Sequence, residues 1–241
     1  MAYTTQVVPV SYKQTDRRWA NKKYANSGEN STIGGSGCGP TAAAMLVATF
    51  VDKKETPVEA CAWAKKHGYK ATGSGTYYTF FKAYFAAHRM DCKQVNSSSV
   101  YHKKNTDADK KAKAALKKGQ YVIACMGPGD WTRSGHFILL RKLKDGVLYI
   151  HDPASSSKSR QRTTFDKMQY QAKYYWIIEP GKIAYFKKKG KPIRYTYKKT
   201  SKIVDRSTKA NQKVYINKEK GAWNRIGYHR WVHNVRLKKS K

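Results

Sequence analysis

A cysteine between two glycines stands where a helix is predicted to begin. Cys38 lies between Gly37 and Gly39, and Pro40 opens an alanine-rich apolar run. Proline suits the first helical turn, where an N–H has no partner, so Cys38 is predicted at or just before a helix N-terminus. The positive end of the helix dipole stabilises a thiolate there, and the two glycines are expected to let a substrate backbone approach the sulfur. The alternative is a buried structural cysteine.

A cysteine nucleophile needs a base, and the second half of the chain offers one. His136 opens an apolar strand after a polar loop, and Asp152 follows the next strand of a predicted hairpin. Asp152 could hold the His136 imidazole in one tautomer and orientation. A two-residue turn at Asp145 and Gly146 would place Asp152 on the opposite face of the sheet from His136. We therefore predict a three-residue turn over residues 144–146, or a bulged turn there, with His151 pointing away from the site.

The elements that must position these residues change in period along the chain. Apolar spacing and capping signals predict helices first and strands after Gly119. The predicted helices are Pro40–Val51, Pro57–His67, Thr76–Arg89 and Asp107–Lys118, and the predicted strands are Tyr121–Met126, Phe137–Leu143, Val147–His151 and Tyr174–Ile178. Helices followed by an antiparallel sheet indicate an α+β domain, which we place at residues 1–180.

The composition indicates a polyanionic partner. The chain has 49 Lys and Arg against 15 Asp and Glu, a net charge of +34. Nucleic acid, an anionic membrane and the teichoic-acid-rich wall of a Gram-positive bacterium all suit this charge. No apolar run is long enough to span a bilayer and no signal-peptide pattern is present, so no membrane insertion is expected. The four cysteines lack metal or redox spacing, so we expect reduced thiols, no metal and no cofactor.

The end of the chain differs in composition and is predicted to be a second domain, residues 181–241. Residues 180–241 hold 20 Lys and Arg and 2 acidic residues. Five short strands are predicted there, which suggests a small all-β barrel. They are Ile183–Phe186, Ile193–Tyr197, Lys213–Ile216, Ala222–Ile226 and Arg230–Val232. Most of the aromatic side chains are expected in the core, while exposed ones could stack on sugars or peptides.

Four separated motifs occur in an order that resembles a known family. They are Val8–Gln14 with Asp16 and Trp19, then Ser36–Thr41, Ser134–Ile138 and Asp152–Pro153. Together they resemble the papain-like cysteine peptidases related to bacteriocin double-glycine leader peptidases, and more narrowly the branch found in phage endolysins and secreted Gram-positive wall proteins. The resemblance covers about residues 7 to 179. Residues 221–237 look like the last strands of bacterial Src-homology-3-like wall-binding domains.

This resemblance implies a role for each matching residue. Cys38 would be the nucleophile, His136 the general base and then acid, and Asp152 the orienting residue. Gln14 would match the glutamine of the oxyanion hole, although it lies 24 residues before the cysteine, whereas the leader peptidases have it only a few residues before. The N-terminal segment must therefore fold back. In the second domain Trp223, Tyr228 and Trp231 would contact the wall.

The resulting expectation is a peptidoglycan hydrolase of the phage endolysin type that cuts an amide by acyl transfer. It would be made in the host cytoplasm and would act on the wall after release through a pore formed by another protein. Two alternatives stay open: a wall-binding protein with an inactive peptidase fold, and a basic nucleic-acid-binding protein, against which the absence of a nucleic-acid motif counts. The bond that is cut, within the peptide or at muramoyl-alanine, is left open, as are the host, the wall ligand and the oligomeric state.

Overall fold

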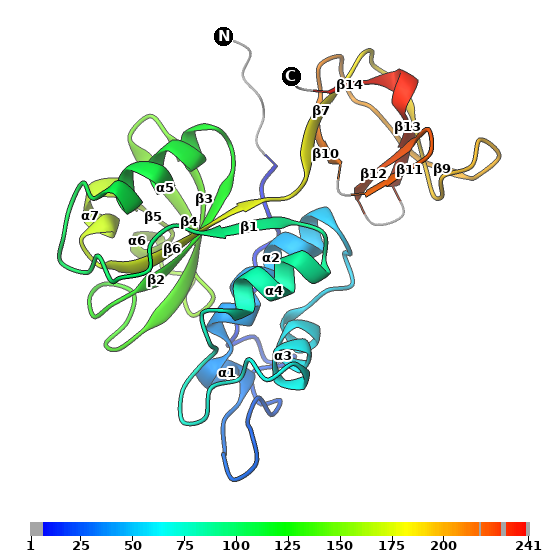
Figure 1. Cartoon of the computed structure of the whole chain (residues 1–241). Helices are drawn as coiled ribbons and strands as arrows, with labels where there is room; N and C mark the ends of the chain where they lie inside the picture. Colours follow the sequence, from blue (N-terminus) through cyan, green and yellow to red (C-terminus); the bar gives the residue numbers. More distant parts are fainter. Residues whose placement is uncertain (1–6, 217, 228–229, 240–241) are drawn as a thin grey trace.

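Figure 1 shows the computed structural model of the chain, which describes residues 7–216, 218–227 and 230–239. The helices come mainly first and a six-stranded antiparallel sheet follows, in the order β1-β6-β2-β3-β4-β5. The helices are α1 Ile33–Ser36, α2 Cys38–Phe50, α3 Pro57–Lys66, α4 Phe80–Ala87, α5 Asp107–Lys117, α6 Lys158–Gln161 and α7 Phe165–Gln169. The strands of this sheet are β1 Asp91–Gln94, β2 Tyr121–Met126, β3 His136–Lys144, β4 Val147–His151, β5 Arg162–Thr164 and β6 Ala172–Glu179.

Local capping chemistry explains where the helices begin. The Thr56 side chain caps α3 and Thr106 caps α5, each in a capping box with an acidic residue three positions later. All four predicted helices are present. The aromatic helix α4 begins at Phe80 and is shorter than predicted. The residues before it are not helical, because Thr76 forms an isolated β-bridge with Lys70 and the Tyr77 N–H donates to the Tyr69 carbonyl at 2.9 Å.

Helices cover both faces of the sheet, as Figure 1 shows, with α2 and α4 on one face and α5 and α7 on the other. Strand β2 is buried along its whole length, and its residues alternate between the two cores. Ile123 and Cys125 belong to the first core, and Val122 and Ala124 to the second. The period of two along a strand produces this division. The α+β prediction is confirmed, and strands β1 and β5, at the two edges of the sheet, are additions to it.

The hairpin between β3 and β4 differs from the prediction in its turn. Lys144 pairs with Val147, so the turn has two residues, and Asp145 and Gly146 have φ values of 50° and 77°. Two positive φ values identify the tight turn that matches strand twist, so the three-residue turn is wrong. The predicted alternative, a bulge in this turn, is not found there either, but the register shifts between Leu140 and Lys142, which places a bulge within the strand pair. One extra residue restores the parity of the two strands beyond it.

The C-terminal strands form two open sheets, of order β10-β7-β14 and β11-β12-β13-β8-β9. A closed barrel is not seen in the described residues, so the Src-homology-3-like fold stays a prediction. The two sheets share a core that includes Phe186, Val214 and Val232. Their strands are β7 Lys182–Phe186, β8 Pro192–Arg194, β9 Ile203–Arg206, β10 Lys213–Ile216, β11 Lys218–Lys220, β12 Trp223–Gly227, β13 Arg230–His233 and β14 Leu237–Lys239, with a short 3-10 helix η1 at Asn234–Arg236.

Tyr215 connects these C-terminal sheets to helix α2 and to the residues before β2. Its ring packs against Phe50 with centroids 5.2 Å apart, and its hydroxyl donates to the Gly119 carbonyl at 3.2 Å. Phe50 ends α2, whose first residue is Cys38. A helix of 13 residues is about 20 Å long, so the C-terminal sheets contact the end of α2 that lies away from Cys38. Among the described residues, none of the helices has the length and apolar character needed to cross a membrane.

Candidate functional site

The loop before Cys38 is shaped by close contacts of the chain with itself. Cys38 is the first residue of α2 and is half-buried. A Cβ at Gly37 would lie 2.6 Å from the Ile33 carbonyl oxygen, and one at Gly39 would lie 3.2 Å from the Phe137 ring. The two glycines therefore allow the chain's own backbone and core to approach, while the expectation that they also admit a substrate backbone stays a prediction.

The structure brings Cys38, His136 and Asp152 together. His136 begins β3 and is 6% exposed, while Asp152 follows β4 and is fully buried. His136 Nε2 donates to Asp152 Oδ1 at 2.7 Å. The Ala154 N–H also donates to that oxygen at 2.8 Å. Because Nε2 of His136 is used by the carboxylate, the remaining ring nitrogen is the one available to the Cys38 sulfur.

The electrostatics of this cluster favour a charged pair. Burial alone would raise the pKa of the Cys38 thiol, but the hydrogen bond and charge of His136, with backbone N–H groups, outweigh it and lower that pKa. Burial alone would lower the pKa of His136, but Asp152 and Cys38 raise it to about 9. The pKa of Asp152 is lowered, because His136, Ala154 N–H and Arg160 together overcome its burial. At neutral pH these directions favour a thiolate beside an imidazolium.

The other three cysteines have the opposite tendency. Burial raises the pKa of Cys92 to about 12 and that of Cys125 to about 11, and it raises the pKa of Cys61 as well. Only the thiolate is a good nucleophile. Cys38 is therefore the one cysteine of the four whose surroundings activate it, and all four lie in the described residues.

Two cations behind Asp152 were not predicted. Arg160 Nε lies 2.6 Å from Asp152 Oδ2, a short charged contact with an angle poor for a hydrogen bond. Arg160 also donates through Nη2 to the Trp131 carbonyl at 2.6 Å, while Trp131 Nε1 donates to the Arg160 carbonyl at 3.1 Å. Lys13 Nζ donates to the carbonyls of Asp152 and Ser155, both at 2.6 Å. Nothing in the spacing of these residues marks them, since each reaches Asp152 only through the fold.

Gln14 lies between the cysteine loop and the residues after β4. Its backbone N–H donates to the Pro153 carbonyl at 2.8 Å, and its side-chain Nε2 donates to the Gly34 carbonyl at 2.7 Å. The N-terminal segment thus folds back to the cysteine loop. His151 points elsewhere and donates from Nε2 to the Pro9 carbonyl at 3.0 Å. Burial and the charge of Arg141 lower its pKa to about 4.

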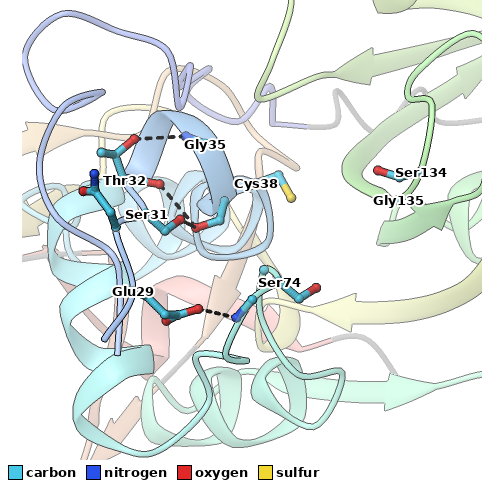
Figure 2. A pocket seen from close by; sticks show the side chains of 12 residues that line it. Glu29, Ser31, Thr32, Gly35, Cys38, Ser74, Ser134 and Gly135 are labelled. Carbon is cyan, nitrogen blue, oxygen red and sulfur yellow. Dashed lines mark hydrogen bonds between the residues drawn. The ribbon is translucent and has the colours of Figure 1, made fainter. Parts of the chain in front are cut away.

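Cys38 opens onto a cavity of about 810 Å³ with small, polar walls. Figure 2 shows the Cys38 side chain with Ser74 on one side and Ser134 and Gly135 across from it. Glu29 ties one wall together, since it accepts from Asn26 N–H and Gly73 N–H and pairs with the buried Lys70. The walls are Glu29, Asn30, Ser31, Thr32, Gly35, Ser36, Gly73, Ser74, Gly75, Ser134 and Gly135. An extended chain with small side chains would fit between such walls.

The three predicted wall-contact residues lie in different settings. Trp231 is 8% exposed and packs on Tyr197 with centroids 5.3 Å apart. Trp223 is partly exposed and packs edge-on against His233 at 5.1 Å. Tyr228 lies outside the described residues. In the part of the chain that the structure describes, no three His, Cys, Asp or Glu side chains converge as metal ligands.

Comparison with known proteins gave one matching family and several solved structures that match part of the chain. Residues 8–180 match the model described as the Peptidase_C39 like family. The peptidase domain of Streptococcus ComA, a bi-functional ABC transporter involved in a quorum-sensing pathway, is 15% identical over 59% of this chain and 90% of its own, with a TM-score of 0.41. A double-glycine-motif protease from an AMS/PCAT transporter is 20% identical over 59% of this chain and 84% of its own, with a TM-score of 0.39. No curated protein matched the chain.

Proposed function

The chain belongs to the Peptidase_C39-like family, and from this premise we propose that it is a peptidoglycan hydrolase of the endolysin type. It cuts an amide in the bacterial wall peptide through Cys38, and its basic C-terminal domain, residues 181–241, holds it on the wall. The observation that carries the proposal is the activated thiol at the edge of a cavity with small, polar walls. Wall peptides are rich in small residues, and such walls leave room for them.

The chemistry proposed is acyl transfer in two steps. The Cys38 thiolate attacks the amide carbon, and the oxyanion that forms accepts hydrogen bonds from the Cys38 N–H and from Gln14. The first turn of a helix leaves its N–H groups without an intrahelical partner, and Cys38 lies in that turn. The Gln14 amide has two hydrogens, and Gly34 accepts one of them.

Proton transfer by His136 completes both steps. The imidazolium gives its proton to the leaving amine as the C–N bond breaks, which leaves a thioester on Cys38 and a neutral imidazole. The imidazole then takes a proton from water, and the hydroxide adds to the thioester. The C–S bond breaks, which restores the thiolate beside the imidazolium and releases a carboxylic acid, and this acid gives its proton to the solvent. Asp152 stabilises the imidazolium throughout, because its Oδ1 accepts from Nε2.

Charge supports the wall as the partner. Residues 180–241 carry 20 Lys and Arg and 2 acidic residues, and such an excess attracts polyanions by long-range electrostatics. Synthesis in the host cytoplasm followed by release through a pore formed by another protein belongs to the same proposal, as does the Src-homology-3-like nature of the C-terminal domain. The route of release and the nature of this domain are both inferred from the resemblance of the sequence motifs to those of phage endolysins.

Fragments released from cell walls test the proposal. Purified Gram-positive walls are incubated with the full chain, with Cys38→Ala and with Cys92→Ala, a matched control on the edge strand β1. We expect new amine termini in the mass spectrum with the native chain and with Cys92→Ala, and none with Cys38→Ala. The fragment masses then identify the bond.

Two other results would replace the proposal. Tight binding without release from walls of several chemotypes would favour a wall-binding protein with an inactive peptidase fold. Salt-dependent retention by DNA without binding to walls would favour a nucleic-acid-binding protein. For Gln14, loss of an oxyanion donor costs about 10² to 10³ in rate, so Gln14→Ala with nearly full turnover would remove that role.

A further inference from the structure

A second cavity, of about 330 Å³, opens in the C-terminal sheets. Its walls come from β8, the loop after it, β12, β13 and η1. They are formed by Arg194, Lys199, Trp223, His233, Val235 and Arg236. The volume is near the lower end of the range for small-molecule sites, roughly 300 to 1,000 Å³, so the cavity suits one unit of a ligand and not a long segment.

The positive charges in this cavity have no acidic partner among the described residues. None of its walls is acidic, and within the described residues no carboxylate lies at ion-pair distance from Arg194, Lys199 or Arg236. Asp205, one of the two acidic residues of this domain, is taken by Arg230 at 2.6 Å. The remaining one, Glu219, does not line the cavity. An anion that enters would therefore meet cations without an internal competitor.

The cavity also has an apolar side that is held in place. Trp223 pairs with His233 across neighbouring strands, and their rings meet edge-on at 80°. Val235 adjoins them and is 64% exposed. On the polar side, Arg194 Nη1 donates to the Ser201 carbonyl at 2.7 Å, which fixes the loop that carries Lys199. A ligand that fits this cavity has an anionic group, which faces the cations, and a carbon chain, which faces the Trp223 side.

We propose that this cavity binds one phosphodiester-linked polyol unit of an anionic wall polymer. Arg194 and Arg236 hold the phosphate, because a guanidinium matches its geometry with two parallel hydrogen bonds. Trp223 covers the carbon chain of the polyol. A repeating phosphodiester also suits the general excess of positive charge in residues 180–241, which hold 20 Lys and Arg against 2 acidic residues. The choice of the wall as the source of this polymer depends on the proposed function.

Titration of the full chain with a synthetic glycerol phosphate trimer tests the site directly. The cavity variant is Lys199→Gln with Arg236→Gln, and the matched control is Lys188→Gln with Lys189→Gln, which removes the same charge from exposed positions outside the cavity. We expect the Kd of the cavity variant to rise at least tenfold, the usual effect of losing a hydrogen bond to a charged group. The control should change by less than about threefold. Trp223→Ala, which keeps every charge, should also weaken binding about tenfold.

Equal losses in the cavity variant and the control would overturn the proposal, because binding would then follow net charge alone. So would a native chain that does not bind the trimer. A second measurement tests whether the polymer comes from the wall. The cavity variant and the control are made in the Cys38→Ala chain, and their retention on purified walls is compared. Removal of phosphodiester polymers from the walls by hydrofluoric acid should abolish the difference in retention between the two. A difference seen only on phosphatidylglycerol vesicles would overturn the wall polymer as the ligand. Trimer binding needs no hydrolysis, so its result and the failure or success of wall cleavage are read separately.

Discussion

Replacing Asp152 by asparagine should return Cys38 toward an ordinary thiol. The pKa of His136 lies at about 9, against an ordinary value of 6.5. This difference corresponds to about 3 kcal/mol in favour of the imidazolium, or a few hundred-fold in its population. Asp152 supplies a large part of it through the 2.7 Å contact with Nε2. Without the carboxylate charge, burial again lowers the pKa of His136 and the thiolate loses its counter-ion.

Alkylation by iodoacetamide measures this without any knowledge of the substrate. The rate at Cys38, followed by peptide mass spectrometry from about pH 5 to 10, reports the thiolate. For Asp152→Asn we expect a rate at pH 6.5 that is about 10²-fold lower and a midpoint shifted to higher pH. Cys61, Cys92 and Cys125 have raised pKa values and serve as slow internal references.

A matched carboxylate separates this effect from the general charge of the protein. Asp166→Asn removes the same charge from a side chain that is 71% exposed, and it should leave the Cys38 profile unchanged. If Asp152→Asn gave the native profile, Asp152 would not hold the imidazolium, and the electrostatic account of the site would be wrong. If both variants shifted it equally, the long-range field of the protein would be the cause.

Three further predictions follow from buried contacts elsewhere. His151 has a pKa lowered to about 4, so its contribution to stability is fully present above pH 6.5 and is lost as the pH falls, by about 2 kcal/mol at pH 5. The free energy of unfolding in urea, measured at pH 7.5 and at pH 5, should therefore depend less on pH in His151→Gln than in the native chain. An equal pH dependence in the two proteins would contradict this. Tyr215→Ala should cost about 3 kcal/mol and split one calorimetric transition into two, whereas Tyr215→Phe should keep one. Gly37→Ala would place a Cβ 2.6 Å from the Ile33 carbonyl oxygen, so it should lower the stability by about 2 kcal/mol and slow the alkylation of Cys38. The control Gly135→Ala has open space at its Cβ and should be as stable as the native chain. Equal losses of stability in the two variants would show that the contact with Ile33 is not the cause.

Features that depend on neighbouring residues could be predicted from the sequence. The starts of α3 and α5 follow from threonine caps and nearby acids, whose hydrogen bonds form within one helical turn. The same local logic places Cys38 at the start of α2 ahead of Pro40. Parity along β3 and β4 required an extra residue for His136 and Asp152 to share a face, and the bulge supplies it. Only its place, in the strand and not in the turn, was missed.

Features that depend on contacts between distant parts of the chain became visible only in the folded structure. Arg160 contacts the Asp152 carboxylate, Lys13 contacts its backbone carbonyl from a distant part of the chain, and Tyr215 reaches Phe50 from another sheet. No periodicity connects such residues, because side-chain contacts across the chain depend on how whole elements pack and not on their spacing. The sequence predicted five of the short C-terminal strands and missed β9, β11 and β14. For the same reason it could not predict how the strands associate into two sheets. The types of residue that do chemistry were legible in the sequence, and the environment that sets their charge came from the fold.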